Sequence, residues 1–389
     1  MRDIPYATQS VTEEDVAAVR DVLLGDWLTQ GPAIPRFEEA FAARHRVRHA
    51  VAVANGTAGL HIACLALGVG PGQRVWTCPN SFAASANCAL YCGAEVDFVD
   101  MDPVTRNMSV ESLAAKLAQS AASGRLPSVV IPVHFAGLPA EMGRLRELAD
   151  RYGFALLEDA SHAVGASDEG HPVGSRYSDA SVFSFHPVKI ITTAEGGIVT
   201  TQDDALARRL RLLRSHGITR DVADFELGGP DPGGWYYEQQ ILGFNYRLTD
   251  LQAALGSSQL LRLDSLHAAR ERLAQRYDGL LAPLPLRLPA RPPTKRSSWH
   301  LYVVEILPEE GVSARAAVFQ HLREAGIGVN VHYIPIHLHP HYRAMGFAPG
   351  QFPACENYYA NALSIPLYPA LGDEQQDRVV AALARALEA

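Results

Sequence analysis

ASVFSFHPVKIITTAEGGIVTT, residues 180–201, is the stretch that decides the fold. Two strand-like runs, ASVFSF and GGIVTT, enclose a polar segment that contains Ser184, His186, Lys189 and Glu195. In open α/β sheets, ligands bind outside the carboxyl ends of the strands. The residues that follow the first run are therefore predicted to face a ligand, and the surrounding chain should supply the rest of such a sheet.

The N-terminal half repeats the alternation of short apolar strands and helices. Strands are predicted over residues 49–54, 74–78, 94–100, 128–135 and 154–160, and helices over 11–24, 55–67, 81–92, 139–153 and 203–217. Thr12 is expected to cap the first helix, because acidic residues fill its first turn. Apolar strands that alternate with helices indicate an α/β fold whose parallel or mixed sheet is covered on both faces.

The C-terminal part follows a different pattern. Residues 249–277 read as one long amphipathic helix, and the proline-rich segment 283–293 is expected to interrupt all regular structure. Strands are predicted over 300–306 and 328–333, and helices over 314–326 and 373–387. The sequence therefore predicts a large domain over residues 1–250, followed by a connecting helix and a small α+β domain over 251–389.

Composition excludes several classes of protein. The formal net charge is -8 and 20% of the 389 residues are charged, so nucleic acid is not an expected partner. The N-terminus has no apolar segment typical of a signal peptide, and the longest apolar run is broken by Asn55, His61 and several glycines, so no membrane span is expected. The five cysteines form no CxxC pair, which favours a reduced, cytoplasmic protein.

Lysine is rare in this chain. Only Lys116, Lys189 and Lys295 are lysines among 34 basic residues, so arginine serves wherever a plain surface cation is needed. Lysine can lose its proton and attack a carbonyl, which arginine cannot. Lys116 lies in a helical pattern and Lys295 in a Pro/Arg/Ser stretch, whereas Lys189 alone follows a strand. Lys189 is the candidate for chemistry, with a surface lysine as the alternative.

Three motifs indicate pyridoxal 5′-phosphate (PLP). NGTAGLHIA, residues 55–63, opens a helix whose N-terminus could bind phosphate, although a tight turn would look the same. Asp159 ends an apolar strand, where it could hold a proton on a heterocyclic nitrogen or only cap a helix. Ser184 and Lys189 then add a hydroxyl and an amine. This order of phosphate cup, carboxylate, serine and lysine suggests PLP.

Three other motifs could mislead. Gly68, Gly70 and Gly72 imitate a dinucleotide fingerprint but lie between a helix and a strand, in the wrong order. Asp100 and Asp102 imitate the metal-binding acids of glycosyltransferases, yet such pairs more often form turns. The last is a histidine cluster in HYIPIHLHPHY, which has no interleaved carboxylate or cysteine, so no metal site is predicted there; it comprises His332, His337, His339 and His341.

The chain resembles the DegT/DnrJ/EryC1/StrS family of sugar-nucleotide aminotransferases, PLP enzymes of fold type I. The resemblance spans nearly the whole chain and rests on WLTQGP, NGTAGL, SFAASANCALYCGA, LLEDASHAVGA, SFHPVKIITTAEGG and GFNYRLTDLQAALG. EDASHA, LRSHGITRD, WYYEQQ and VNVHYIPIH most resemble the branch that makes UDP-4-amino-4,6-dideoxy-N-acetyl-β-L-altrosamine for pseudaminic acid. Fold type I implies a large domain with a mixed, mostly parallel sheet and a smaller C-terminal α+β domain.

The resemblance implies roles for individual residues. Lys189 would bind the cofactor aldehyde and move protons, while Asp159 would keep the pyridinium nitrogen protonated. Phe82 would stack on the ring, and His162, where many members have glutamine, would lie against it. The phosphate would be held by Gly56, Thr57 and Ser184, together with Asn245 from the neighbouring subunit of an obligate homodimer. The sugar-nucleotide pocket would be lined by Tyr6, Thr29, Asn330, His332, Tyr333 and His341.

The implied reaction transfers an amino group from L-glutamate to the 4-keto carbon of a UDP-linked 2-acetamido-2,6-dideoxy-hexos-4-ulose. Some relatives carry histidine in place of the lysine and are dehydratases, but here the lysine is present. Three alternatives stay open on the sequence. They are an aminotransferase for another dTDP-, GDP- or UDP-linked keto sugar, a metal-dependent glycosyltransferase that uses Asp100 and Asp102, and a PLP-binding protein without turnover.

Overall fold

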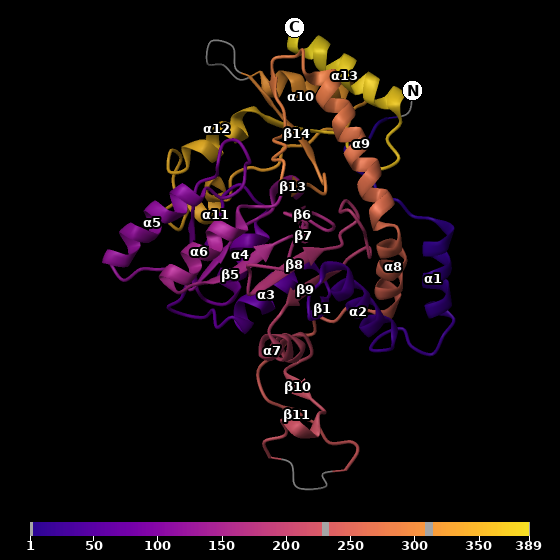
Figure 1. Cartoon of the computed structure of the whole chain (residues 1–389), viewed down its shortest axis with the longest axis vertical. Helices are drawn as coiled ribbons and strands as arrows, with labels where there is room; N and C mark the ends of the chain where they lie inside the picture. The colour runs from indigo at the N-terminus through magenta and orange to yellow at the C-terminus, as the bar shows by residue number, and fades with distance from the viewer. Residues whose placement is uncertain (1–2, 228–232, 308–313, 389) are drawn as a thin grey trace.

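A seven-stranded sheet forms the centre of the protein. The computed structural model describes residues 3–227, 233–307 and 314–388 (Figure 1). In spatial order the strands are β1 (His49–Val53), β9 (Gly197–Thr201), β8 (Ala180–Ser184), β5 (Ala155–Asp159), β4 (Val129–Ile131), β2 (Arg74–Thr77) and β3 (Glu95–Phe98). The adjacent strands β8, β5, β4, β2 and β3 run parallel, and β9 is antiparallel to both of its neighbours, so the predicted mixed, mostly parallel sheet is confirmed.

Both faces of the sheet are buried, as continuous apolar strands require. Successive residues of a strand point to opposite faces. In β8, Val182 belongs to one hydrophobic cluster and Phe183 to another, and in β9, Val199 and Ile198 divide in the same way. One cluster includes residues of α3 (Gly56–Ala66), α4 (Ala84–Tyr91), α5 (Val110–Ala122) and α6 (Met142–Tyr152), whereas the other includes residues of α2 (Ala33–His45) and α8 (Asp250–Leu261). The strand ends are therefore the part of the sheet that stays open to a ligand.

The helices that cover the sheet begin where capping residues stand. Thr12 is the N-cap residue of α1, as predicted, and its amide donates to the Asp15 carboxylate, while Asn55 Oδ1 accepts a hydrogen bond from the Ala58 amide at the start of α3. The sequence pattern did not predict α2. The covering helices are α1 (Glu13–Leu23), α2 (Ala33–His45), α3 (Gly56–Ala66), α4 (Ala84–Tyr91), α5 (Val110–Ala122), α6 (Met142–Tyr152) and α7 (Asp204–Arg214).

The predicted long helix is two helices, α8 (Asp250–Leu261) and α9 (Leu263–Leu281). Arg262 separates them with a backbone ψ of 3°. Its guanidinium donates hydrogen bonds to the Ser10 carbonyl and to the buried carboxylate of Asp15. The break therefore coincides with a contact to the N-terminal segment that the hydrophobic pattern of the helix could not indicate.

The C-terminal part has a hydrophobic core of its own. It contains residues of α9, of the sheet β12 (Leu286–Arg287), β14 (Tyr302–Ile306) and β15 (Ala362–Ile365), and of α10 (Arg315–Glu324) and α13 (Asp373–Glu388). Ile4, from the other end of the chain, packs in the same core. The boundary at residue 250 stays a prediction.

Two predictions for this part are wrong. The proline-rich segment 283–293 contains β12, so it does not interrupt all regular structure. Shortly after it, β13 (Lys295–Arg296) pairs with β6 (Ser167–Asp168), and β7 (His171–Pro172) pairs with the other side of β6. Residues 328–333 form no strand beyond one bridge from Asn330 to Ser364, since Val331 N–H bonds to the Asn330 side chain instead. The remaining elements are α11 (Pro340–Arg343), α12 (Pro353–Asn361) and the 3₁₀ turns η1 (Phe135–Gly137), η2 (Val222–Asp224) and η3 (Ile336–Leu338).

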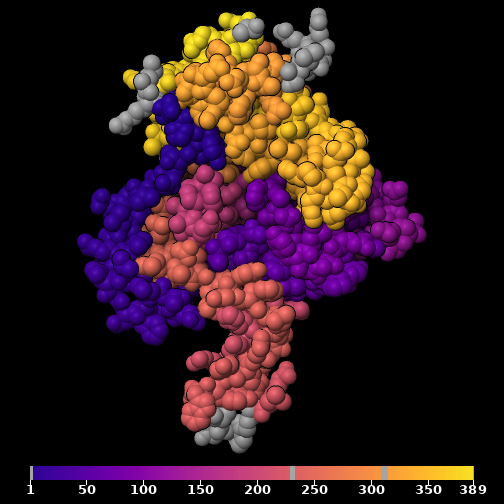
Figure 2. All heavy atoms as spheres, turned by 180° about the vertical axis from the view of Figure 1, so that it is seen from behind, coloured from indigo at the N-terminus to yellow at the C-terminus, as the bar shows by residue number. Residues whose placement is uncertain are grey.

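An arm projects from the body between α7 and α8. Figures 1 and 2 both show the segment that carries β10 (Ile218–Thr219) and β11 (Glu238–Gln239) extending away from the sheet. Several large apolar side chains on it are exposed, including Val222, Leu227, Trp235 and Leu242. A two-stranded ribbon is marginally stable alone. In the described part of the chain, no helix is long and apolar enough to cross a bilayer.

Candidate active site

The loop between β8 and β9 presents Lys189 at the carboxyl end of β8. Ser184 ends β8 and Gly197 begins β9, and the Phe185 carbonyl accepts hydrogen bonds from the Thr193 amide and the Thr192 hydroxyl. The Lys189 amide donates to the His186 carbonyl over 2.8 Å, which closes the turn. The lysine therefore stands on a fixed loop at the strand end, in the position that the sequence indicated.

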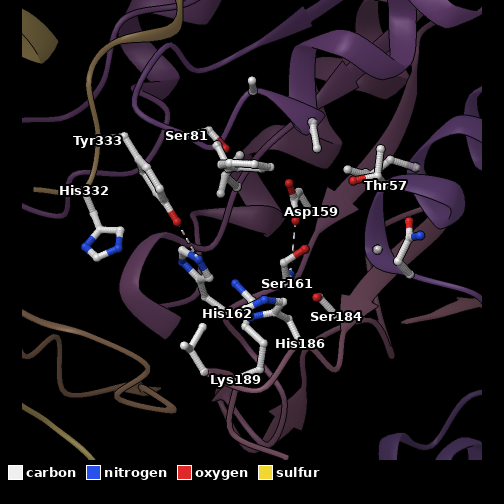
Figure 3. Close-up of a pocket in the computed structure, with 18 of the residues that line it drawn as sticks. Thr57, Ser81, Asp159, Ser161, His162, Ser184, His186, Lys189, His332 and Tyr333 are labelled. Carbon is white, nitrogen blue, oxygen red and sulfur yellow. Dashed lines mark hydrogen bonds between the residues drawn. The ribbon is translucent and has the colours of Figure 1, made fainter. Parts of the chain in front are cut away.

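A pocket of about 990 Å³ opens at this edge of the sheet. It brings together residues from α3, β5, β8 and the segment 330–334, which are distant in sequence (Figure 3). Among the residues predicted for cofactor or substrate, those that line the pocket are Tyr6, Gly56, Thr57, Phe82, Asp159, His162, Ser184, Lys189, Asn330, His332 and Tyr333. Their common location agrees with one shared site, while their individual roles stay predictions.

Lys189 lies in the pocket without a close ionic partner. Among the described residues, no hydrogen bond or ion pair to its Nζ is found. Burial lowers the pKa of Lys189 to about 8, and the negative charge of Asp159 opposes that shift only in part. A lysine with this pKa can release and take up a proton near neutral pH, which an exposed lysine cannot do.

Asp159 provides a buried carboxylate beside this lysine. It is 5% exposed, and its oxygens accept hydrogen bonds from the Ser85 hydroxyl at 2.6 Å and from the Ser161 amide at 3.1 Å. Ser85 is in turn hydrogen-bonded to Ser81 at 2.7 Å. The Ser161 contact closes a turn, and no helix directly follows Asp159 among the described residues, so the capping alternative from the sequence is wrong. Both donors leave carboxylate lone pairs free to accept an N–H from a bound heterocycle.

The N-terminus of α3 forms a cup for an anion. Asn55 satisfies the amides of Ala58 and Gly59, whereas the amides of Gly56 and Thr57 have no acceptor among the described residues. A Cβ on Gly56 would lie 3.1 Å from Ser184 Cβ and 3.7 Å from Ser161 Oγ, so two hydroxyl-bearing side chains stand over the helix end. Unpaired amides, the helix dipole and serine hydroxyls fit a phosphate group.

Gly197 is required by the same cup. A Cβ at this position would lie 2.8 Å from the Asn55 carbonyl carbon and 2.9 Å from the Gly56 nitrogen. The start of β9 thus packs directly on the start of α3, and any larger residue would push the cup open. Anion cup, carboxylate and free lysine occupy one pocket, so the residues present fit PLP.

Neutral aromatic and imidazole groups form the opposite wall. His162 is 4% exposed, and burial together with the charge of Lys189 lowers its pKa well below the usual range. Burial also lowers the pKa of His332 to about 4, and its Nδ1 lies 2.7 Å from Ser364 Oγ. Tyr6 is hydrogen-bonded to Asn330. At neutral pH this wall is polar and uncharged, which suits sugar hydroxyl groups.

Three predicted site residues lie outside the pocket. Thr29 is exposed and forms a bridge with Thr249, Asn245 is exposed and forms a bridge with Ser215, and His341 is exposed on α11. Phe82 lines the pocket but is 62% exposed, with its ring 6.4 Å from that of Tyr333. Asn245 was predicted to act in a neighbouring subunit, and a single chain cannot bring it into its own pocket.

The misleading motifs have structural roles. Asp100 accepts hydrogen bonds from the amides of Ala354 and Cys355 at the start of α12, and Asp102 accepts from Val104 and Thr105 in a turn. Because both carboxylates bind backbone, the structure gives the glycosyltransferase alternative no support. In the part of the chain that the structure describes, no cluster of histidine, cysteine and acidic side chains could hold a metal ion.

Sequence reasoning missed part of the pocket. Ser81, Ser161, His300 and His339 also line it. Ser161 follows Asp159 by two residues and could have been found from that spacing, as could Ser81, which precedes Phe82. His300 lies 138 positions after His162, and only the fold places their ring centroids 4.3 Å apart. No sequence pattern indicates such a contact.

Comparison with known proteins identifies the family. Residues 9–384 match the DegT/DnrJ/EryC1/StrS aminotransferase family. The chain is 37% identical over 383 residues to the spore coat polysaccharide biosynthesis protein SpsC of Bacillus subtilis, covering 98% of this chain and 96% of that protein.

Solved structures agree over the whole length. The putative sugar aminotransferase Spr1654 of Streptococcus pneumoniae, solved in PMP and PLP forms, superposes with a TM-score of 0.90 for the PMP form at 29% identity over 99% of both chains. PseC of Helicobacter pylori, an aminotransferase of pseudaminic acid biosynthesis, gives a TM-score of 0.90 at 28% identity over 100% of both. The expected fold type I and the expected PLP dependence are thereby confirmed, and the chain belongs to the DegT/DnrJ/EryC1/StrS aminotransferase family.

Proposed function

We propose that this protein transfers the amino group of L-glutamate to the 4-keto carbon of a UDP-linked 2-acetamido-2,6-dideoxy-hexos-4-ulose, as in pseudaminic acid biosynthesis. The observation that carries the proposal is Lys189, a pocket lysine whose pKa is lowered to about 8 and which faces a carboxylate and an anion cup. Bound PLP would supply an aldehyde that accepts the amino group and a protonated ring that withdraws electrons.

The chain's own residues would do the rest. Lys189 Nζ would take a proton from the carbon that gives up the amino group and would deliver a proton to the carbon that receives it. Asp159 would accept the ring N–H, with Ser85 and Ser161 fixing its orientation. Gly56, Thr57 and Ser184 would bind the phosphate, and Phe82 would cover the ring. The buried position of Asp159 keeps water from competing for that proton.

The sugar would lie against the uncharged wall. Tyr6, Asn330, His332 and Tyr333 offer hydroxyl, amide and imidazole groups, and His339 extends this wall at the same pocket. Thr29 and His341, exposed outside the pocket, would contact the nucleotide part of a substrate that extends beyond it. Neutral donors can bind sugar hydroxyls and a keto oxygen without attracting competing anions.

The active unit is proposed to be a homodimer with shared sites. The projecting arm exposes Leu227 at 88% and Trp235 at 80%, which is costly for a free surface feature. Asn245 lies at the base of this arm, outside the pocket of its own chain. If the arm packs on a second copy, Asn245 would reach that copy's phosphate cup, and Asn245→Ala should weaken PLP binding without changing the monomer fold.

The location is proposed to be cytoplasmic. All five cysteines are free and buried, which agrees with a reducing compartment. Fractionation of the native host would test this, and recovery of the protein outside the cytoplasm would contradict it.

The sugar assignment is the most specific part of the proposal. It is supported by the likeness to PseC, whereas SpsC is named for a spore coat polysaccharide. The test is a panel of UDP-, dTDP- and GDP-linked 4-keto sugars with L-glutamate, followed by mass spectrometry of the products. Preference for the UDP-linked 2-acetamido sugar supports the proposal, and preference for a dTDP or GDP sugar would replace it.

A separate measurement tests for an inactive binding protein. Glutamate added to the PLP-loaded protein should bleach the yellow colour and release 2-oxoglutarate in the absence of any sugar. A colour that persists with glutamate and with each alternative amino donor would favour a protein that binds PLP without turnover.

A further inference from the structure

His332 stands on the pocket wall with one ring nitrogen bonded to the protein and the other open. Its Nδ1 lies 2.7 Å from Ser364 Oγ, and Figure 3 shows the ring beside Tyr333 at one side of the pocket. Its Nε2 has no hydrogen-bond partner among the described residues, yet it is not one of the buried polar atoms that lack a partner. Since His332 lines the pocket, Nε2 is the ring nitrogen that a bound molecule can reach.

Hydrogen bonds hold the backbone of this wall in place. The Tyr358 hydroxyl donates to the His332 carbonyl over 2.8 Å. Asn330 and Ser364 exchange both of their backbone hydrogen bonds, at 3.2 Å and 2.8 Å. These contacts bring the side chain of Ser364, on β15, to the ring of His332, and the position of the ring proton is then decided by this one partner.

The hydroxyl of Ser364 favours one tautomer of His332. Burial and the charge of Lys189 lower the pKa of His332 to about 4, so the ring carries a single proton at neutral pH. Ser364 is fully buried, and among the described residues His332 Nδ1 is the one partner of its hydroxyl. If the hydroxyl donates to Nδ1, both groups are paired and the ring proton is on Nε2. If Nδ1 carries the proton, the buried hydroxyl hydrogen has no acceptor, which disfavours that tautomer by roughly tenfold.

We propose that Ser364 is a positioning residue: its hydroxyl donates to His332 Nδ1 and thereby places an N–H donor, at Nε2, on the pocket wall for an oxygen atom of the keto sugar. The inference rests on the proposed function, because it takes the molecule at this wall to be the sugar. A carbonyl oxygen can only accept a hydrogen bond, so this donor favours a substrate that presents a carbonyl oxygen there. Ser364 itself does not line the pocket and acts through His332.

The position of the proton can be measured directly. NMR of the full-length, PLP-loaded protein, labelled in its histidine ring nitrogens, separates protonated from bare nitrogens. The pair of signals that is lost in His332→Phe belongs to His332. The expected result is a protonated Nε2 and a bare Nδ1 in the wild type, and a mixture of both tautomers in Ser364→Ala. A proton on Nδ1 in the wild type would overturn the inference, and this readout needs no turnover.

Kinetics test what the donor does for the sugar. Ser364→Ala should raise the KM of the 4-keto sugar about three- to tenfold, the loss of one hydrogen bond. It should change the rate of bleaching by glutamate less than about twofold, because that half of the reaction involves no sugar. In the His332→Phe background the same change should alter the KM less than about twofold. A packing role for Ser364 would produce an equal loss in both backgrounds, which would overturn the inference.

Ser181→Ala is the matched control, because Ser181 is also a fully buried strand serine and its hydroxyl donates to Glu158, outside the pocket. It should leave the KM of the keto sugar unchanged. If Ser364→Ala unfolds, as judged by thermal melting, Ser364→Cys, whose thiol is a weak donor, replaces it in both backgrounds. Failure of every 4-keto sugar to be aminated would overturn the proposed function and with it the role toward the sugar, whereas a proton on His332 Nδ1 would overturn this inference alone.

Discussion

Two lysines of this chain have opposite surroundings. The Lys295 side chain is 4% exposed, and its Nζ lies 2.9 Å from Asp168, 3.0 Å from Glu141 and 3.0 Å from the Ala140 carbonyl. Lys189 stands in an open pocket, and burial lowers its pKa to about 8. The two lysines therefore differ in their close acceptors, and we expect only Lys189 to be reactive.

The difference in close acceptors assigns the two lysines different roles, a structural role for Lys295 and a chemical role for Lys189. Lys295 joins β13 to β6 and to the loop before α6, so its charge is compensated and its role is structural. Lys189 carries an uncompensated amine that destabilises the PLP-free fold but can react with an aldehyde. The following predictions are ordered by the expected size of their effects on this comparison.

Lys189→Ala should produce the largest effect. Turnover should fall by at least about a thousandfold, because the covalent attachment and the proton transfer depend on this amine. PLP should still bind, but without covalent attachment, as judged by its removal on gel filtration. Lys295→Arg is the control and should keep activity; measurable transamination by Lys189→Ala would show that another residue carries the chemistry.

Asp159→Asn should come next. An amide cannot hold a proton on the ring nitrogen, so the rate should fall by about a hundredfold while the fold persists. The amide oxygen can keep only one of the two hydrogen bonds, because Ser85 and Ser161 donate to different oxygens of the carboxylate. Single-turnover kinetics with glutamate would measure the effect, and a loss below about threefold would contradict the assigned role.

Lys295→Met should lower stability and spare activity. The change leaves Asp168 and Glu141 without their shared cation and should cost about 1–3 kcal/mol in the free energy of unfolding. Urea unfolding of the PLP-free protein would measure it. An unchanged midpoint would mean that solvent compensates both carboxylates.

Lys189→Met should change stability in the opposite direction. It removes an amine that is charged at neutral pH and lacks a close partner, and should raise the free energy of unfolding by on the order of 1 kcal/mol, since solvent in the open pocket screens part of the cost. The same urea series applies. A decrease comparable to that of Lys295→Met would refute the contrast between the two lysines.

The pH dependence of stability should show the smallest effect. The folded pKa of Lys189 is about 8 and the unfolded value is about 10.4, so the unfolded chain binds more protons between these values. The destabilising effect of the Lys189 charge is therefore absent above about pH 10.4 and becomes complete as pH falls to about 8, so stability rises with pH across this window. The difference in unfolding free energy between wild type and Lys189→Met should narrow as pH rises through this window, whereas a constant difference would contradict the lowered pKa.

Much of the sheet could be predicted from the sequence. Short apolar runs between capped helices predict β1, β5, β8 and β9 correctly, because fully buried strands and amphipathic helices leave distinct patterns. The end of α8 at Arg262 and the loss of the strand at 328–333 could not be predicted. The first depends on the contact of Arg262 with Asp15, which is distant in sequence, and the second on the hydrogen bond from the Val331 amide to the Asn330 side chain, which a hydrophobic pattern does not indicate.

The candidate site divides in the same way. Lys189, Asp159 and the N-terminus of α3 could be predicted, since each follows a strand that ends at the pocket edge. His300 could not, because its contact with His162 arises from packing between segments distant in sequence. Thr29, Asn245 and His341 came from the family resemblance and lie outside the single-chain pocket.

The most direct test of the central claim is to locate the cofactor on one of the three lysines. Borohydride reduction of the PLP-loaded protein fixes the cofactor to its lysine, and peptide mass spectrometry then identifies the site. The pocket geometry predicts a single modified residue, Lys189, with Lys116 and Lys295 unmodified. Modification of either of the other two lysines, or of none, would contradict the claim that Lys189 is the reactive lysine.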